Sequence, residues 1–466
     1  MHKFLLQFHG RMLEGIGSHR RYLLAIICVG CFLRVLSLLN TCAIEIDGVE
    51  YAKVAEALVG GRFGEALSNV FSPGYPLFVG LLHLLVPDIE LSGRLISLVF
   101  GTLLIWLSFV LGKRVFKDDN KAVLLSFLVA FHPLLVTYSG KVLSESVATF
   151  FFCLTIFLFY VSWQENRRVL LGLAGFCLVL TYLTRPEYLV YYGPLILLLL
   201  ASKRLSDSLI LLLPLCVIGS LYALYLHDRT GLWMVSNKAT LSPFVSLSTF
   251  FVNIPLVVFC FLMAISPLFV LLTGLGFAKI TYSYRNLLLM VVVFHILSLA
   301  FISHSTKRYS VELIPLCLIG AVEGFYIITQ YAARSFNHRL VRLVMICIIV
   351  VTSVLLGYPP MHADRALQKQ AGLFLLSYDP GSTIAARLPL AAFYGKGKNV
   401  NLLTEMSVRN GQSQLQTMLA EKRVRYMVVD EKTKSQLPFL CDYLSETKMI
   451  WSTGDTSTFV SIYRIP

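Results

Sequence analysis

The acidic residues that follow the first long apolar run are the first candidates for chemistry. Glu45, Asp47 and Glu50 come directly after 22–40, an apolar run of about 20 residues, which is the length that crosses a bilayer. Asp47 precedes a glycine and the expected start of a helix, a position that fixes its direction. A carboxylate there could accept a proton from an attacking hydroxyl as a general base, or help to hold a divalent cation. Glu45 and Glu50 could instead serve only loop solubility, and Asp47 could be a helix N-cap.

A second acid, Glu145, stands in the motif Lys141–Ser146 between two apolar runs. The helix dipole favours an acid in the first turn, so Glu145 could simply cap the helix that follows. It is also expected to face the same compartment as Asp47. The alternatives are therefore a capping acid and the second carboxylate of a site.

Two groups of cations could bind a phosphate. Arg185 lies in the very short turn Thr184–Tyr188, where it could contact a phosphate or pair with Glu187. The run His304-Ser305-Thr306-Lys307-Arg308-Tyr309 brings two adjacent cations and a tyrosine to a helix junction. An arginine there can bind two oxygens of a lipid phosphate at once. The alternative for this run is interfacial snorkelling beside an aromatic belt residue.

Arg34 lies inside the first apolar run. A charge within a membrane span is costly and is usually retained for a purpose. A carboxylate partner would offset the cost, but the sequence does not name one.

Composition indicates the class of protein that must position these groups. The chain has 466 residues, of which 56% are hydrophobic and 14% charged, and its mean hydropathy is +0.72. These values are typical of a polytopic helical membrane protein and exclude a soluble globular one. The net charge of +14 does not indicate nucleic-acid binding, because no basic stripe interleaved with aromatics accompanies it. In a membrane protein, basic residues mainly set the topology.

Hydropathy and loop charge together predict about eleven transmembrane helices. The expected spans are 22–40, 94–112, 122–138, 145–162, 169–184, 188–201, 208–226, 250–275, 286–302, 309–329 and 343–358. Basic residues gather in alternate loops, which predicts that the N-terminus is cytoplasmic and that Asp47 and the C-terminal region lie outside. The protein is expected in the cell inner or plasma membrane. The first helix is expected to be an uncleaved anchor.

The remaining segments are expected to lie outside the bilayer. The first outer loop, 41–93, should carry interfacial helices over 49–59 and 75–86. Residues 1–358 would form the transmembrane domain and 359–466 a small extracytoplasmic α/β domain. In that domain the pattern predicts strands over 382–386, 426–429 and 458–463 and a helix over 411–422. A disulfide between Cys42 and Cys441 stays open.

These features resemble the C-type (GT-C) membrane glycosyltransferases, and among them the protein O-mannosyltransferase and lipid A aminoarabinose transferase group. The resemblance covers about residues 20–330. It is carried by Asp47-Gly48 with Tyr51, Phe71–Leu77, Gly93–Ser97, Ser139–Glu145, Leu183–Glu187 and Lys307–Tyr309 with Ile314-Pro315. The chain has Asp47-Gly48 where a paired Asp-Glu would be expected, which puts the protein O-mannosyltransferase branch in doubt.

The resemblance implies an activity and roles for these residues. Such enzymes transfer a sugar from a polyprenyl-phosphate carrier to a lipid, glycan or protein acceptor on the outer face of the membrane. Asp47 would be the base or acceptor-positioning acid and Glu145 a second functional acid, with a divalent metal near them compatible with the pattern. Residues expected to receive the donor phosphate are Arg185, Lys307, Arg308 and Tyr309, and those expected in the substrate loop are Tyr51 and Tyr75.

The rival function is a polytopic transporter or lipid flippase. Transporters tend to show internal repeats and polar groups at the bilayer midplane. The sequence shows no repeat, and the candidate groups gather at one surface. The identity of the sugar and the acceptor, the metal requirement and the oligomeric state do not follow from the sequence.

Overall fold

The computed structural model describes residues 19–234, 236, 245–302, 306–357, 363–406, 412–455 and 458–466. Its contacts divide the chain into two compact units. The membrane unit comprises Met1–Leu38 and Tyr51–Pro359. The C-terminal unit comprises Pro360–Pro466 together with Leu39–Glu50, the short segment that carries Asp47.

The membrane unit is built from apolar helices, eight of which, within the described residues, are long and apolar enough to cross a bilayer. They are α2 (Arg20–Asn40), α6 (Ile89–Phe116), α9 (Glu145–Glu165), the run α12 (Leu205–Pro214), η2 (Leu215–Gly219) and α13 (Ser220–Thr230), α14 (Leu247–Ile265), α16 (Tyr282–Ile302), η5 (Lys307–Leu313) with α17 (Ile314–Ala332), and α18 (His338–Gly357). A ninth span is α7 (Asp119–Phe131) with α8 (Pro133–Ser139), if this pair bent by 58° crosses as one. Shorter apolar helices are α10 (Arg168–Thr184), η1 (Pro186–Tyr191) with α11 (Tyr192–Ala201), and α15 (Pro267–Gly276) with η4 (Phe277–Lys279).

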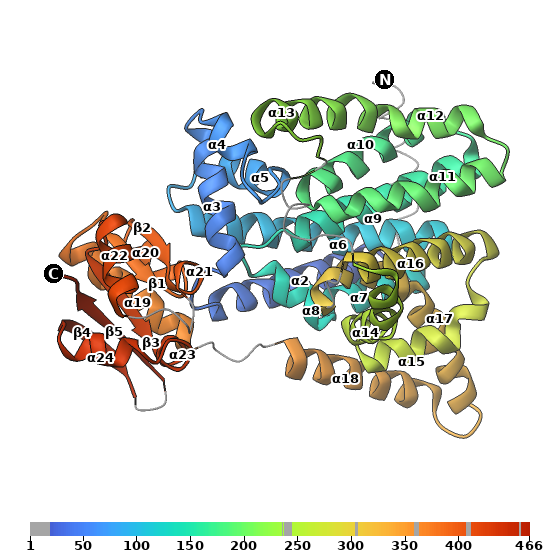
Figure 1. The fold of residues 1–466 in the computed structure, drawn as a ribbon. Coiled ribbons are helices and arrows are strands. Elements are labelled where there is room, and N and C mark those ends of the chain that lie inside the picture. The colour runs from blue at the N-terminus through green and yellow to red at the C-terminus, as the bar shows by residue number, and fades with distance from the viewer. Residues whose placement is uncertain are drawn as a thin grey trace. The chain divides into compact units, whose positions relative to one another are not determined.

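Every predicted span has a helical counterpart, but two predictions of continuity are wrong. The expected single span 122–138 is broken between α7 and α8, which are bent by 58°. The expected single span 250–275 is broken between α14 and α15. Pro267 lacks a backbone N–H and disfavours helix at the residue before it, and Ser266 accordingly has an extended ψ of 139°. The φ of Ser266 is 75°, a left-handed value that ends the helix there. In Figure 1, α9 lies beside both α6 and α10, and both pairs are in contact. This packing brings the start of α9 next to the end of α10.

The break between α7 and α8 explains the buried charge on α2. Pro133 has no N–H, so the carbonyl of Val129 lacks its usual helical donor. Arg34, which is fully buried, donates to the carbonyl oxygens of Val129 and Ala130 at 3.4 and 3.1 Å, and to that of Gly30 at 2.9 Å. The partners of this arginine are therefore backbone carbonyls, two at the break between α7 and α8 and one on its own helix, in place of the carboxylate considered from the sequence.

The loop after α2 is helical, as the sequence predicted for 49–59 and 75–86. It contains α3 (Ile46–Val59), α4 (Phe63–Leu67) and α5 (Gly74–His83). A Cβ on Gly74 would lie 2.6 Å from the backbone of Leu183 and of Thr184. Only glycine allows this approach, which places the start of α5 against the last turn of α10.

The C-terminal unit is a doubly wound α/β fold. Its five-stranded sheet has the order β2-β1-β3-β5-β4, with β1 parallel to β2 and β3, and β5 antiparallel to β3 and β4. In chain order the elements are α19 (Ala363–Tyr378), β1 (Thr383–Ala386), α20 (Leu390–Tyr394), β2 (Lys398–Asn401), α21 (Leu402–Glu405), α22 (Gln412–Glu421), β3 (Tyr426–Asp430), α23 (Glu431–Gln436), α24 (Leu440–Ser445), β4 (Lys448–Gly454) and β5 (Phe459–Arg464). One core contains α19 and α20, and the other contains α22 and α24.

Most elements predicted for this unit are present. Strands β1, β3 and β5 match the three predicted strands, and α22 matches the helix predicted over 411–422, of which residue 411 lies outside the described residues. Strands β2, with four residues, and β4, with seven, were missed. Cys441 is an exposed free thiol, so the disulfide to Cys42 is absent.

Candidate active site

The acid Glu145 and two arginines form a buried ion cluster in the membrane unit. Glu145 is the first residue of α9, and its side chain is 1% exposed. Arg185 donates from Nη1 to Glu145 Oε1 at 2.8 Å, and Arg308 donates from Nε to the same oxygen. Two arginines that lie 40 and 163 positions after Glu145 in the chain thus bind its carboxylate. All three residues were candidates from the sequence.

Local structure fixes where these side chains lie. Arg185 ends α10 in an extended conformation with φ −148° and ψ 110°, as expected for the residue before a proline. Arg308 is the second residue of η5, a 3₁₀ helix that contacts α9. Glu145 occupies the first turn of α9, where the helix dipole favours a negative charge. Helix ends, and the breaks between helices, therefore build the cluster.

Arg185 is also held by Glu187 and Tyr309. Its Nε lies 2.8 Å from Glu187 Oε1, and its guanidinium lies 5.0 Å from the centre of the Tyr309 ring. Burial alone would lower the pKa of Arg185, but the attraction of Glu187 and Glu145 raises it well above its usual value. Arg185 is therefore a permanent cation in a fixed orientation. Of the two alternatives from the sequence, the pair with Glu187 is present, and contact with a phosphate stays a prediction.

The cluster has one unsatisfied acceptor and an accessible cationic side. Glu145 Oε2 is buried and accepts no hydrogen bond from the described residues. The side chain of Arg308 is 28% exposed, whereas that of Arg185 is 6% exposed. Lys307, at the start of η5, is exposed. A ligand that reaches the cluster therefore meets Arg308 and Lys307 before Arg185.

The two tyrosines predicted for the substrate loop are buried next to this cluster. The Tyr51 hydroxyl lies 3.0 Å from Ser144 Oγ, directly before Glu145. Tyr75 donates to the Gly93 carbonyl at 2.9 Å, and its ring lies edge-on to that of Tyr51 at 5.1 Å. Burial raises the pKa of both hydroxyls, so both stay neutral. In this structure the tyrosines pack the loop helices α3 and α5 against the start of α9 and the start of α6.

Asp47 lies in the first turn of α3, which begins one residue earlier at Ile46. The predicted helix start after Asp47 is therefore too late, and the N-cap alternative is wrong. A carboxylate in the first turn is still favoured by the helix dipole. Tyr51 follows one turn later on the same helix. Asp47 itself is half-buried within the C-terminal unit.

A buried polar network beside the cluster was missed from the sequence. Glu312 Oε1 accepts a hydrogen bond from the Tyr191 hydroxyl at 2.9 Å, and this hydroxyl lies 2.7 Å from His295 Nδ1. His295 Nε2 lies 2.9 Å from Ser310 Oγ. The network links η1, which follows Arg185, to η5 and α16. An acid inside the predicted span 309–329 was the available signal, of the same kind that singled out Arg34.

The other sequence-based expectations for the site have mixed outcomes. Among the residues that the structure describes, no group of three or more His, Cys, Asp or Glu side chains could hold a metal ion. The acid of the cluster is bound by guanidinium groups, so the expected divalent metal stays a prediction. His304 and Ser305, which precede the cations of η5, lie outside the described residues.

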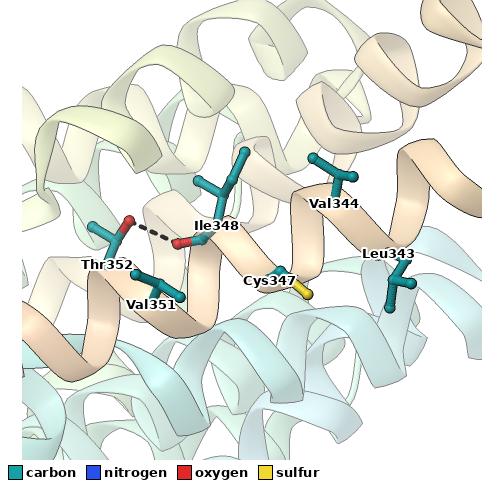
Figure 2. A pocket seen from close by; sticks show the side chains of 6 residues that line it. All are labelled: Leu343, Val344, Cys347, Ile348, Val351 and Thr352. Atoms are coloured by element: carbon teal, nitrogen blue, oxygen red, sulfur yellow. Dashed lines mark hydrogen bonds between the residues drawn. The ribbon is translucent and has the colours of Figure 1, made fainter.

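A hollow of about 390 Å³ on α18 is not a candidate for this chemistry. Figure 2 shows the side chains that line it, which lie along one face of α18. They are Leu343, Val344, Cys347, Ile348, Val351 and Thr352. The only hydroxyl, on Thr352, donates to the Ile348 carbonyl of its own helix at 2.7 Å. An apolar face on an exposed, span-length helix suits contact with lipid.

Comparison with known families gives one match, in the first half of the chain. Residues 71–225 match a family model described as dolichyl-phosphate-mannose-protein mannosyltransferase. This stretch contains Glu145 and Arg185 and ends before Lys307 and Arg308. No curated protein matches the chain.

Comparison with solved structures gives matches over nearly the whole chain. ArnT from Cupriavidus metallidurans in the apo state is 13% identical, covers 96% of this chain and 98% of its own, and has a TM-score of 0.67. The same protein bound to undecaprenyl phosphate gives 12% identity, the same coverage and a TM-score of 0.62. An oligosaccharyltransferase from Archaeoglobus fulgidus, in complex with zinc and sulfate, gives 13% identity, coverage of 94% and 72%, and a TM-score of 0.62. At these identities the likeness concerns the fold.

Proposed function

We propose that this chain, whose fold is that of the C-type membrane glycosyltransferases, transfers a sugar from a polyprenyl-phosphate-linked donor to an acceptor at the outer face of the membrane. The observation that carries the proposal is the convergence of Arg185 and Arg308 on the single buried carboxylate of Glu145. The structural match to ArnT bound to undecaprenyl phosphate supports the class of donor. The alternation of basic loops supports an outer location for the site, with the N-terminus in the cytoplasm.

In this proposal the donor phosphate binds on the exposed side of the cluster. Arg308 and Lys307 make the first contacts, and Arg185 with Tyr309 forms the fixed rear wall. Guanidinium groups bind phosphate oxygens in pairs, which gives orientation as well as affinity. The leaving polyprenyl phosphate gains negative charge as the glycosidic bond breaks. Cations that are already fixed in place stabilise that charge in the transition state.

Glu145 has two tasks in this scheme. Its Oε1 balances the charge of the two arginines and sets their separation. Its Oε2, buried and unsatisfied by the described residues, is free to accept a hydrogen bond from a hydroxyl of the donor sugar. A buried acceptor that only the substrate satisfies gives selectivity for sugars with a hydroxyl at that place.

Asp47 is the proposed base. It would take the proton of the attacking acceptor group, with the leaving phosphate on the opposite side of the anomeric carbon. In-line attack of this kind inverts the configuration of the sugar. A product that retains the donor configuration would exclude this arrangement. The acceptor, whether lipid, glycan or protein, would reach Asp47 through the loop 41–93.

Donor binding can be tested with purified full-length protein and undecaprenyl phosphate as the probe. We expect undecaprenyl phosphate, but not undecaprenol, to raise the thermal stability of the wild type. Arg308→Ala should lose most of this rise, because Arg308 is the accessible cation that Glu145 holds in place. Arg167→Ala is the matched control, since Arg167 forms an ion pair with Glu165 at the other end of α9. If Arg308→Ala responds like the wild type, the proposed phosphate site is wrong.

The reaction can be tested by mass spectrometry of surface lipids and glycans from cells with and without the gene. We expect one sugar-modified species to disappear on deletion and to return with the wild-type gene. If the protein instead moves a lipid or solute in vesicles and no modified product depends on it, the transporter or flippase alternative holds.

A further inference from the structure

The segment directly before Asp47 is buried within the C-terminal unit. Ala43, Ile44 and Glu45 are 2%, 1% and 9% exposed. The backbone N–H of Ile44 donates to the Tyr394 hydroxyl at 2.8 Å, and Arg365 donates from Nη1 to Glu45 Oε2. These contacts join positions that are 350 and 320 residues apart in the chain. The polar groups of this segment, which leaves a membrane helix, are therefore bound by the C-terminal domain.

The two groups that bind the segment stand on a rigid support. Arg365 lies on α19 and Tyr394 ends α20. A Cβ on Gly372 of α19 would lie 2.7 Å from both the Ala391 carbonyl oxygen and Tyr394 Cβ, so the two helices touch backbone to backbone. Both helices pack on one face of the sheet. Lys369 of α19 also lies over the Tyr394 ring, 4.7 Å from its centre.

We infer that the C-terminal domain sets the position of Asp47, with Arg365 and Tyr394 as positioning residues. The inference rests on the proposed role of Asp47 as base. Asp47 lies two residues after Glu45 and in the first turn of α3, so a shift of the bound segment moves its carboxylate directly. A base must lie within hydrogen-bond reach of the proton that it removes. The C-terminal domain would thus control the reaction rate through the position of the segment that it binds.

The inference separates two properties that a general loss of structure would change together. Donor binding depends on the cluster of Glu145, Arg185 and Arg308, which contains neither positioning residue. Misplacing Asp47 should therefore slow transfer and leave the binding of undecaprenyl phosphate unchanged. A displacement of about 1 Å at a reacting group can lower a rate by up to about 100-fold.

The main test is a charge reversal with its compensating partner. Arg365→Glu replaces the attraction to Glu45 with repulsion. We expect transfer in cells to fall by about 10- to 100-fold. The protein level and the binding of undecaprenyl phosphate should stay normal. The double variant Glu45→Arg with Arg365→Glu restores the attraction with the charges exchanged and should recover most of the transfer. Arg425→Glu is the matched control, because Arg425 pairs with Asp379 at an exposed site of the same domain. It should transfer like the wild type.

Each outcome decides between the inference and its premise. If Asp47→Asn still transfers sugar, the proposed base is wrong whatever the other variants do. If Asp47→Asn is inactive while Arg365→Glu transfers like the wild type, the positioning role is wrong. Failure of the folded double variant to recover activity also overturns it. If Arg365→Glu does not fold, Tyr394→Phe, which removes the acceptor of the Ile44 N–H, replaces it. A normal transfer rate in Tyr394→Phe then contradicts the inference.

Discussion

Two buried carboxylates, one in each unit, bind arginine in very different ways. Asp430 accepts from Arg387 Nη2 at 2.7 Å and from Gln368 at 3.2 Å on one oxygen. Its other oxygen accepts from the backbone N–H and the hydroxyl of Thr433 at 2.8 and 2.5 Å. Glu145 has both of its guanidinium partners on one oxygen, and its other oxygen has no donor among the described residues.

The difference separates an acid that serves the fold from one that is available to a substrate. A fully satisfied buried network rigidifies the structure around it, whereas a buried acceptor without a donor costs stability until something completes it. Asp430 ends β3 and is the N-cap of α23 (Glu431–Gln436), so its network joins that strand to that helix. Replacing Asp430 should therefore affect stability, and replacing Glu145 should affect catalysis.

The largest effect is expected for Glu145→Gln. The amide keeps the size of the side chain but leaves Arg185 and Arg308 without the charge that holds them together. We expect transfer to fall by about 100- to 1,000-fold, the loss found when one group is removed from a preorganised electrostatic site. Quantitative mass spectrometry of the sugar-modified product in cells checks this.

Glu165→Gln is the control for this prediction. Glu165 ends the same helix and also binds two arginines, Arg114 at 2.8 Å and Arg167 at 2.7 Å, but it is 30% exposed. Transfer in this variant should match the wild type. Equal losses in both glutamate variants would mean that the α9 ion pairs matter for folding alone.

The next effect is expected for Asp430→Asn, on stability. The amide places an N–H₂ group where the carboxylate accepted hydrogen bonds from Arg387 and Thr433. We therefore expect the free energy of unfolding of the C-terminal domain to fall by about 3 kcal/mol, the cost of breaking a buried ion pair. Protease susceptibility of the full chain at increasing urea measures it. Transfer per folded molecule should not change. If the variant resists proteolysis as well as the wild type does, Asp430 does not stabilise the C-terminal domain.

The pH dependence of the same variant sharpens the comparison. Burial would raise the pKa of Asp430, but Arg387 and Thr433 lower it below its usual range. A lowered folded pKa means that the stabilisation is complete above the pKa of an unfolded aspartate, about 3.9, and is lost as the pH falls through the folded value. The stability gap between wild type and Asp430→Asn should therefore be constant from neutral pH to about pH 5 and shrink in stronger acid. A gap that persists unchanged at pH 2 would contradict the assignment.

The smallest effect is expected for Tyr51→Phe. It removes one neutral hydrogen bond, to Ser144, and leaves the ring contacts with Phe71 and Tyr75 in place. The loss of stability should be about 1 kcal/mol. Thermal unfolding of the purified protein measures it. A loss of transfer as large as that of Glu145→Gln would instead mean that the Tyr51 hydroxyl touches the substrate.

Sequence alone was enough to predict the class of fold. Long apolar runs and short-period alternation are local properties, and they correctly indicated the membrane helices and three of the five strands. The resemblance to C-type membrane glycosyltransferases came from short motifs, and the family match and the similar folds agree with it. The failures have local causes as well. Strands β2 and β4 have weakly alternating sequences, KNVN and KMIWSTG, and Pro267 breaks a hydrophobic run that hydropathy treats as continuous.

The arrangement of the site could be predicted only in part. Loop charge predicted that Glu145, Arg185 and Arg308 lie on one side of the membrane, and this topology stays a prediction. It could not predict that both arginines bind one oxygen of Glu145, because a contact between residues 163 positions apart depends on helix packing. The contact between Glu45 and Arg365 spans 320 positions and left no signal in the sequence. The contacts of several site residues are now known, but the roles given to all of them stay predictions, namely those of Asp47, Glu145, Arg185, Lys307, Arg308, Tyr309, Tyr51 and Tyr75.

The buried Arg34 has a consequence for how this protein can change. Its charge is tolerated because Pro133 withholds an N–H and leaves carbonyl oxygens open at the end of α7. Replacing the proline would let the helix bond to itself and would leave a charge in the bilayer with fewer partners. Replacing the arginine alone would leave the carbonyl oxygens of Val129 and Ala130 without this hydrogen-bond donor. Either substitution alone is therefore destabilising, so the two positions should change together during evolution. A relative without this proline should also lack the arginine.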